Sequence, residues 1–457
     1  MAGTTMPTGL GLVTDLYELT MAASYRQLGM DDRATMSLFV RKLPEGRSFL
    51  VAAGLERALG RLERFGFDET GIDYLVSTGH LRREDAEALA GTRFTGDVRA
   101  VPEGTVVFPD EPILEVDAPI IEAQLAETLM LNAIHFPTLV ATKAARCVAA
   151  ARGKDLVDFG LRRTPGIEAS LEVARACWIA GFTSTSNVEA ARMFGIPASG
   201  TVAHAFIEAM PDERSAFEAW ARTSAGPITF LVDTYDTLHG TRRAVEVALR
   251  VREQGCTVAA LRLDSGDLDA LSRAARKILD DAGLRDVRIF ASGGLDEYAI
   301  DALVRAEAPI DGFGVGTRIG MSADAPVLDM AYKIVEYARR PCLKLSSKKA
   351  TLVGRKQVWR RRTSEGRFVE DRICVLDEPS PGGDWQPLLE HVVRGGRTLA
   401  RPGLDEVRRF HAAQIASLPP ALVAVDARPT YPVAQSSELR TRHRAAVADA
   451  RVREGLA

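Results

Sequence analysis

The feature that most constrains the fold is a rhythm of short apolar runs that begins at residue 155. Helical patterns such as 240–253 and 267–281 separate the runs. Alternation of this kind predicts βα units and a parallel sheet. About six or seven units at a spacing of roughly 30 residues favour an irregular (β/α) TIM-like barrel over an open sheet. The apolar runs cover residues 155–160, 197–204, 228–233, 258–264, 287–294 and 310–317.

The segments on either side of this rhythm have a different character. Residues 92–118 alternate short β runs with Pro-Glu-Gly and Pro-Asp-Glu turns, which predicts a β-rich lobe. Residues 344–361 read as strands around a turn and could rejoin that lobe. We therefore predict an α/β protein in three parts: an N-terminal helical and β-rich α+β lobe over 1–150, the βα barrel over 151–340, and a C-terminal extension over 341–457.

Composition excludes several classes of protein. Of the 457 residues 46% are hydrophobic and 26% charged, as in ordinary globular proteins, and a net charge of −3 argues against a nucleic-acid partner. The five scattered cysteines form no C-x-x-C pair, which predicts reduced thiols rather than disulfides or a zinc site. The sequence contains no run of about 18 apolar residues, so we predict no membrane span. Residues 1–7 lack the basic region and apolar run of a signal peptide. We expect a cytoplasmic protein.

Polar and glycine residues follow the apolar runs. Because the carboxyl ends of parallel strands meet at one edge of a sheet, we expect these residues to gather around a ligand. They are Phe159, Arg162, Arg163, Thr201, His204, Asp233, Arg262, Asp264, Ser292 and the glycines of 293–294 and 314–316.

Two glycine-containing ends come late in the rhythm, "SGGL" at 292–295 and "GFGVGT" at 312–317. Glycines let backbone N–H groups approach an anion closely, and barrels frequently bind phosphate at their last strands. The alternative is that the glycines only make tight turns. With two such ends we favour a phosphate site that includes Thr317.

Three arginines, Arg162, Arg163 and Arg262, follow apolar runs. One arginine there would be interpreted as a structural ion pair, but three at one edge favour anion binding. The carboxylates of Asp264 and Asp233 could hold Mg²⁺ directly or through water, or cap the following helices, as we expect for Asp267.

His204 is one of only seven histidines and stands where a buried strand favours Val, Ile or Leu. The sequence contains no P-loop and no paired metal histidines, so a zinc role is not predicted. Phe159 and Tyr17 are aromatics outside an obvious core pattern that could stack on a flat ring or simply pack.

With these motifs in view, the chain resembles nicotinate phosphoribosyltransferase. The resembling segments run in family order and span about three-quarters of the chain: "LVTDLYELTMAASY", "FLVAAGLE", "FGLRR", "STSNVEAARMFGIPASGTVAHAF", "LVDTYDT", "ALRLDSGDL", "IFASGGLDE", "DGFGVGT" and "KLSSKKATLVGRKQV". The resemblance implies an irregular βα barrel with an N-terminal β-rich lobe, assembled as a homodimer. The implied activity is of ligase type: nicotinate and phosphoribosyl pyrophosphate give nicotinate mononucleotide and pyrophosphate for NAD salvage, coupled to hydrolysis of ATP with Mg²⁺ as cofactor.

The resemblance also implies roles for single residues. His204 matches a histidine that ATP phosphorylates, and Tyr17 an aromatic that reaches the pyridine ring from the neighbouring subunit. Phe159 would stack on the other face of the ring. The remaining implied contacts are Thr201 and Arg262 with nicotinate, Arg162 with phosphate or pyrophosphate, and Gly293, Gly294, Gly316 and Thr317 with the ribose phosphate; Asp264 is taken as catalytic with His204 and Arg262.

The chemistry agrees with such a role for His204. The nucleophile is the pyridine nitrogen, whose lone pair needs no general base. Arginine and Mg²⁺ can meet the charge of the leaving pyrophosphate, and a neutral imidazole is a good phosphoryl acceptor. Nicotinamide-using relatives carry Asp at the position of Ser186, so we expect Ser186 to favour the acid over the amide.

Other interpretations stay open. The chain could be a phosphoribosyltransferase for nicotinamide or quinolinate. The chain could also be a degenerate barrel that binds a nucleotide and has a regulatory role. The presence of His204, Arg262 and both glycine ends argues against this interpretation. A generic phosphate-binding isomerase is the weaker alternative, because the sequence offers no clear acid–base pair.

Overall fold

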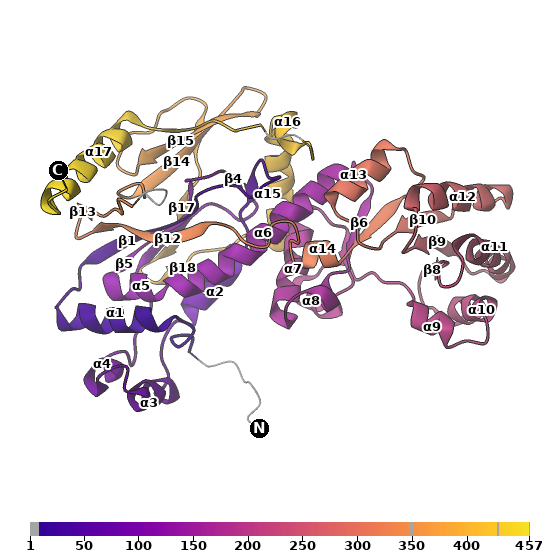
Figure 1. Cartoon of the computed structure of the whole chain (residues 1–457), viewed down its shortest axis with the longest axis horizontal. Coiled ribbons are helices and arrows are strands. Elements are labelled where there is room, and N and C mark those ends of the chain that lie inside the picture. Colours follow the sequence, from indigo (N-terminus) through magenta and orange to yellow (C-terminus); the bar gives the residue numbers. More distant parts are fainter. Residues whose placement is uncertain (1–8, 347–350, 427–428, 457) are drawn as a thin grey trace. The chain divides into compact units, whose positions relative to one another are not determined.

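A computed structural model describes residues 9–346, 351–426 and 429–456 (Figure 1). The chain divides into two compact units. Unit 2 consists of Val140–Pro326 with Val423–Asp426. Unit 1 consists of the described residues within Met1–Leu139, Val327–Leu422 and Ala427–Ala457. The chain therefore begins in unit 1, builds unit 2 and then returns to unit 1. Residues 1–7, which bear on the signal-peptide prediction, lie outside the described residues.

Unit 2 contains a mixed α/β fold built on a parallel sheet. Its six strands follow the order β7-β6-β11-β10-β9-β8, and every neighbouring pair is parallel. The predicted parallel sheet is confirmed as a half-barrel, whereas closure into a full barrel is not seen among the described strands, because β7 and β8 are edges. The strands are β6 (Asp155–Asp158), β7 (Ser184–Thr185), β8 (Ile228–Leu231), β9 (Val258–Leu263), β10 (Arg288–Ala291) and β11 (Gly312–Val315).

One expected strand is absent from this sheet. The apolar run 197–204 contributes a single bridge, in which Ala198 pairs with Thr185, and its last residue, His204, begins α9 (His204–Glu208). Pro197 has no N–H to give to a ladder and Gly200 has no side chain to pack, so the run lacks what a central strand needs. The expectation that His204 ends a strand is therefore wrong.

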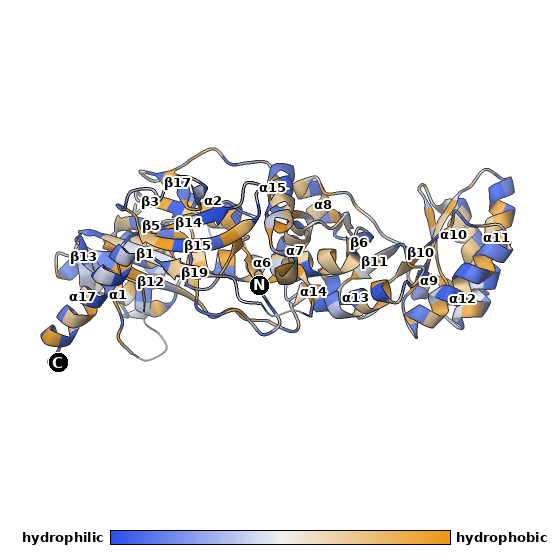
Figure 2. Cartoon of the chain, turned by 90° about the horizontal axis from the view of Figure 1, so that it is seen from above, coloured by the Kyte–Doolittle hydropathy of each residue, from blue (hydrophilic) through white to orange (hydrophobic). Residues whose placement is uncertain are grey.

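The helices of unit 2 are amphipathic, with hydrophobic and hydrophilic residues on different sides (Figure 2). In α12 (Leu268–Asp281) the buried residues Ser272, Ala275 and Leu279 follow one another at helical spacing. Aspartates cap several of these helices: Asp267 accepts the N–H of Ala270 at 3.2 Å, as predicted. The other helices are α7 (Ile167–Ala180), α8 (Val188–Phe194), α10 (Glu213–Thr223), α11 (Thr237–Glu253), α13 (Glu297–Arg305) and α14 (Thr317–Gly320).

Unit 1 contains a seven-stranded sheet that combines strands from distant parts of the chain. Its order is β13-β12-β1-β5-β3-β17-β18. The C-terminal β17 (Glu390–Arg394) pairs antiparallel with β3 (Asp97–Ala100). The other strands are β1 (Arg33–Val40), β5 (Pro112–Pro119), β12 (Met330–Tyr337), β13 (Arg340–Pro341) and β18 (Arg397–Thr398).

A second, four-stranded sheet of unit 1 comes from the C-terminal part, in the order β16-β14-β15-β19. Its strands are β14 (Lys356–Arg362), β15 (Phe368–Val375), β16 (Trp385–Pro387) and β19 (Val433–Gln435). The strands expected over 344–361 are thus represented by β14, while residues 347–350 lie outside the described residues. The longer helices of unit 1 are α1 (Leu16–Gln27), α2 (Leu55–Glu63), α3 (Glu69–Thr78), α15 (Leu404–Ser417) and α17 (Ser437–Arg453). Helix α6 (Glu127–Ala151) begins in unit 1 and ends in unit 2.

A buried ion pair ties the C-terminal elements to β4 (Val106–Val107). The side chain of Arg360 on β14 is fully buried, and its Nε lies 2.9 Å from the carboxylate of Asp371 on β15. Its Nη2 donates to the Val106 carbonyl at 2.9 Å, and its Nη1 donates to Gln414 of α15 at 3.2 Å. One guanidinium therefore joins four elements of unit 1.

Candidate active site

The carboxyl ends of β9 and β10 hold an arginine at the centre of the candidate site. Arg262 donates from Nε to Ser292 at 2.8 Å, from Nη1 to Thr201 at 2.8 Å and from Nη2 to Asp264 at 2.7 Å. Its Cζ lies 5.2 Å from the ring centroid of Phe159, which is the distance of a cation–π contact. A guanidinium has five N–H groups, so three bonds fix it in place and leave two for a ligand.

His204 stands beside this arginine with a different partner at each nitrogen. Its Nδ1 lies 3.0 Å from the hydroxyl oxygen of Thr234. Its Nε2 lies 3.8 Å from Asp264 Oδ2 and 4.0 Å from Asp233 Oδ1. If the proton is on Nδ1 and is donated to Thr234, the lone pair of Nε2 points to the side with the two carboxylates.

The two carboxylates differ in their surroundings. Burial opposes ionisation of Asp264, but the hydrogen bond from Ser292 and the adjacent Arg262 outweigh it and lower the pKa of the Asp264 carboxyl. Asp233 Oδ2 accepts the N–H of Asp264 at 3.0 Å and the hydroxyl of Ser265 at 2.5 Å. Asp233 Oδ1 is buried and has no hydrogen-bond partner among the described residues. Asp233 thus joins the ends of β8 and β9 and keeps one oxygen toward His204.

The residues of the predicted phosphate cradle follow two adjacent strands. Gly293 and Gly294 come after β10, and Gly316 and Thr317 after β11. Gly293 has φ +94°, and a Cβ placed there would overlap the Asp264 carbonyl oxygen. Gly294 has φ +68°, with open space around it. The sequence thus needs glycine at 293 for close approach of two strand ends, and the binding of phosphate stays a prediction.

The aromatic ring of Phe159 follows β6 and is half buried. It lies 6.1 Å from the ring of Phe290 between centroids, and a Cβ at Gly314 would come within 2.5 Å of its Cε2 atom. Arg162 and Arg163 are exposed in a short 3₁₀ turn, Leu161–Arg163. The N–H of Ser186 donates to the Asp158 carbonyl at 2.8 Å, which places Ser186 directly after β7.

A cavity of about 210 Å³ connects several of these residues. Phe159 and Thr201 line it near the carboxyl ends of the strands, and Asp155, Arg288 and Asp311 line it near their amino ends. Small side chains such as Ala259 and Ala260 leave the space between. The candidate site therefore opens onto a hollow along the half-barrel.

Sequence reasoning missed two residues that hold this site together, Asp158 and Thr234, and it placed Ser292 at the site without a role. Asp158 is buried and accepts the Gly160 N–H and the Thr185 hydroxyl, both at 2.7 Å. Burial raises the pKa of Asp158, although these two hydrogen bonds act in the opposite sense. Thr234 and Ser292 support His204 and Arg262. An acid inside the apolar run "DLVDFG" was the available signal for Asp158, whereas Thr234 left no signal in the sequence.

Tyr17 is the one predicted site residue of unit 1. It lies on α1 with 48% of its surface exposed. Partial burial of its hydroxyl, with Glu127 and Glu18 nearby, raises the pKa of Tyr17 to about 12. Every other predicted site residue belongs to unit 2. The place of Tyr17 beside a pyridine ring stays a prediction.

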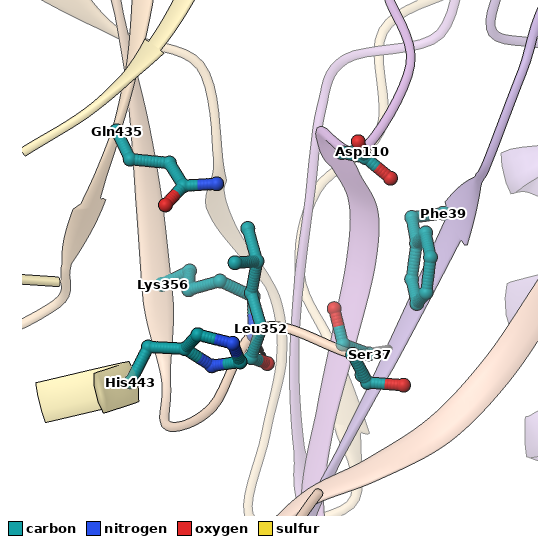
Figure 3. A pocket seen from close by; sticks show the side chains of 8 residues that line it. Ser37, Phe39, Asp110, Leu352, Lys356, Gln435 and His443 are labelled. Atoms are coloured by element: carbon teal, nitrogen blue, oxygen red, sulfur yellow. Dashed lines mark hydrogen bonds between the residues drawn. The ribbon is translucent and has the colours of Figure 1, made fainter. Parts of the chain in front are cut away.

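Unit 1 has a cavity of its own, of about 250 Å³ (Figure 3). Ser37 and Phe39 of β1, His443 of α17 and Lys356 of β14 line it. The ammonium group of Lys356 is already bonded, to the Gly354 carbonyl at 2.7 Å and to Glu115 at 3.1 Å. The residues that line this cavity include no arginine and no glycine, unlike the candidate site in unit 2.

The described residues contain neither a cluster of metal-ligating side chains nor a helix suited to cross a membrane. Within 9–346, 351–426 and 429–456, no group of three or more His, Cys, Asp or Glu side chains is placed to hold a metal ion. None of the described helices has the length and apolarity needed to cross a membrane.

Two family models match the chain. The N-terminal domain of nicotinate phosphoribosyltransferase matches residues 12–135, and the nicotinate phosphoribosyltransferase family matches residues 155–338.

Individual proteins give the same result. The chain is 50% identical over 431 residues to nicotinate phosphoribosyltransferase pncB2 of Mycobacterium tuberculosis, covering 94% of this chain and 92% of that protein. It is 42% identical over 378 residues to the nicotinate phosphoribosyltransferase of Bacillus subtilis, covering 81% and 77%. The crystal structure of human nicotinic acid phosphoribosyltransferase matches with a TM-score of 0.83 at 27% identity, over 95% of this chain and 99% of that one.

Proposed function

The chain belongs to the nicotinate phosphoribosyltransferase family, and from that premise we propose how its residues carry out the reaction. The enzyme transfers the phosphoribosyl group of phosphoribosyl pyrophosphate to nicotinate, giving nicotinate mononucleotide and pyrophosphate in NAD salvage. The observation that carries the assignment of residues is Arg262, which is held by three bonds beside the ring of Phe159.

Nicotinate is a flat ring with a carboxylate, and these residues suit both features. The two remaining N–H groups of Arg262, one on each Nη, suit the carboxylate, and the hydroxyl of Thr201 adds to them. The ring would stack on Phe159, with Tyr17 of a second subunit on its other face. The pyridine nitrogen then attacks the ribose carbon as the bond to pyrophosphate breaks. Binding aligns the two reactants, and no proton has to be removed.

Phosphate groups have two places to bind. The ribose phosphate would lie at Gly293, Gly294, Gly316 and Thr317, and the leaving pyrophosphate near Arg162. Asp264 is kept ionised by its neighbours and would hold Mg²⁺ directly or through water, beside the phosphates. When bound, the ion neutralises charge that develops on the leaving pyrophosphate.

Coupling to ATP is proposed to run through His204. The lone pair of its Nε2 attacks the γ-phosphorus of ATP, and the bond to the bridging oxygen breaks so that ADP leaves. The contact of Nδ1 with Thr234 supports this choice of nitrogen. The phosphoryl group on Nε2 would then lie close to the carboxylates of Asp264 and Asp233. Repulsion from these charges favours later transfer of the phosphoryl group to water.

The finer architecture is part of this proposal. The half-barrel of unit 2 would be the ordered part of an irregular (β/α) barrel, with an N-terminal β-rich lobe in unit 1. A homodimer would supply Tyr17 in trans. Exposed apolar side chains such as Ile167 and Val188 support burial against another subunit.

An assay of the purified protein tests the function. The protein is incubated with phosphoribosyl pyrophosphate and with nicotinate, nicotinamide or quinolinate, each with and without ATP and Mg²⁺. Of the three pyridines, we expect only nicotinate to give a mononucleotide product, and we expect the rate to rise when ATP is added. Turnover of nicotinamide or quinolinate in preference to nicotinate would reject the assignment.

A further inference from the structure

A buried acid that the proposed reaction does not use lies at the start of α10. The side chain of Glu213 is 1% exposed, and neither carboxyl oxygen has a hydrogen-bond partner among the described residues. Nη1 of Arg243, on α11, is 4.0 Å from Oε2, beyond hydrogen-bond reach. Burial without hydrogen bonds penalises a charged carboxylate. The observed surroundings therefore suit the protonated, neutral acid.

Glu213 lies beside Gly240 of α11, and Gly240 in turn lies against Val232, which precedes the loop that supports His204. A Cβ placed at Gly240 would lie 3.0 Å from Glu213 Oε1 and would overlap the Val232 carbonyl oxygen. Gly240 therefore leaves no room for a side chain between Glu213 and Val232. Val232 is followed directly by Asp233 and Thr234, which face the two nitrogens of His204. A movement of Glu213 can therefore reach the imidazole of His204 through Val232 and the two residues that follow it.

Three charged groups act on this carboxyl. Asp236 caps α11, Arg243 lies about two helical turns further along, and Asp233 belongs to the loop. The residue before Glu213, Asp212, caps α10 itself. Burial raises the pKa of Glu213 to about 7; Asp236 and Asp233 add to the rise, and Arg243 acts against it. The charge on Glu213 consequently changes near neutral pH.

We propose that Glu213 is a positioning residue: in its protonated form it holds the loop between β8 and α11, and through that loop the His204 imidazole. Loss of the proton to solvent creates a charge that repels Asp233 and Asp236 and attracts Arg243, so the loop and the imidazole shift. The catalytic consequence rests on the phosphoryl transfer proposed above for His204. The prediction is a fall in ATP-stimulated turnover as pH rises through the titration of Glu213.

The test compares Glu213→Gln with wild type between about pH 5.5 and about pH 8.5. Glutamine keeps the shape and cannot ionise. We expect the ATP-stimulated increment of the wild type to fall by about threefold to tenfold across this range, and that of Glu213→Gln to lack this fall. Transfer without ATP should give superimposable pH profiles in both proteins. Glu218→Gln is the control, because Glu218 lies on the same helix but is exposed and paired with Arg250.

A second measurement does not depend on catalysis. Histidines labelled with ¹³C at Cε1 are followed by NMR against pH, and the His204 signal is assigned from its loss in His204→Ala. In the wild type and in Glu218→Gln, the His204 signal should show an added inflection near the titration of Glu213 that Glu213→Gln lacks. Glu213→Asp, which keeps a carboxyl, should restore the inflection and serves if the glutamine variant does not fold.

The outcomes separate the two proposals. If the enzyme forms no nicotinate mononucleotide in any variant but the NMR inflection depends on Glu213, the proposed function fails and the coupling of Glu213 to His204 stands. If turnover responds to ATP but pH profiles and His204 signals are the same in Glu213→Gln and wild type, the positioning role of Glu213 is refuted.

Discussion

At the scale of single residues, hydrogen bonds within the protein hold the side chains of the candidate site. Arg262 is bonded to Ser292, Thr201 and Asp264, and His204 is oriented by Thr234. Fixed donors of this kind need little reorganisation when charge develops on a reacting group. The side chains that are proposed to touch substrate can therefore be separated by substitution from those that only orient them.

Replacing His204 by Ala removes the proposed phosphoryl acceptor but none of the bonds of Arg262. We expect the ATP stimulation to disappear and the transfer without ATP to remain, within about threefold of the wild type. Steady-state rates with and without ATP measure this directly. Incubation with γ-labelled ATP and an alkaline quench should give a base-stable, acid-labile adduct in the wild type alone; a persisting adduct in His204→Ala would disprove the role of this side chain.

Replacing Ser186 by Asp tests discrimination between acid and amide. A carboxylate after β7 would repel that of nicotinate and accept a hydrogen bond from the amide of nicotinamide. We expect kcat/KM for nicotinate to fall by about tenfold to a hundredfold, with the ratio of nicotinamide to nicotinate turnover rising. Ser186→Ala is the control that removes the hydroxyl without adding charge. An unchanged ratio in Ser186→Asp would show that another residue reads the carboxylate.

At the scale of elements, the ends of the parallel strands decide what the site can hold. The ends of β9 and β10 approach so closely at Gly293 that no side chain fits against the Asp264 carbonyl. Gly294 has the same left-handed backbone but open space around it. Substitutions at Gly293 and Gly294 therefore separate the effect of steric overlap on stability from the effect of backbone conformation.

Gly294→Ala should cost about 1–2 kcal/mol of unfolding free energy, because a left-handed backbone is strained for alanine. Gly293→Ala should cost about 1–3 kcal/mol more, because the strand ends must also move apart. The displaced Asp264 should raise KM for phosphoribosyl pyrophosphate as well. Denaturant titrations and initial rates check both statements, and equal losses in the two variants would contradict the close approach.

The same elements show what the sequence could reveal. Runs of Val, Ile, Leu and Phe predicted five of the six parallel strands, and Asp267 was recognised as a cap. The run 197–204 was misassigned as a strand because its apolar residues outweighed Pro197, which cannot donate to a ladder, and Gly200, which has no side chain to pack. The two-residue strand Ser184–Thr185 is too short to leave a pattern in the sequence. Thr234 was missed, and Ser292 was placed at the site without a role, because the role of a hydroxyl depends on its tertiary neighbours.

At the scale of the whole molecule, unit 1 depends on long-range ties within it. Arg360 joins β14, β15, β4 and α15, so a single guanidinium connects segments that are far apart in sequence. Its neighbour Arg361 pairs with Glu370 at 2.8 Å, with 42% of its side chain exposed. These adjacent arginines offer a matched comparison.

Arg360→Met should lower the unfolding free energy by about 3–5 kcal/mol, because it leaves the Asp371 carboxylate buried without its partner. Arg361→Met should cost less than about 1 kcal/mol, as exposed pairs do. Replacing Asp371 by Leu in the Arg360→Met background should recover part of the loss. Thermal and denaturant unfolding report all three; similar stability of the two single variants would show that the buried pair is not what holds these elements.

The pairing of β17 with β3 has a consequence for synthesis of the protein. About 290 residues separate the two strands, so at roughly 5–20 residues per second a ribosome needs roughly 15–60 s between them. Throughout that interval the β3 edge of the nascent sheet lacks its neighbour, while Val140–Pro326 of unit 2 are being synthesised. A message cut short just before codon 390 would thus yield a polypeptide that contains Val140–Pro326 but lacks β17 and residues 423–426 of unit 2. Its unpaired β3 edge would favour aggregation, which makes it a natural client for chaperones and proteases.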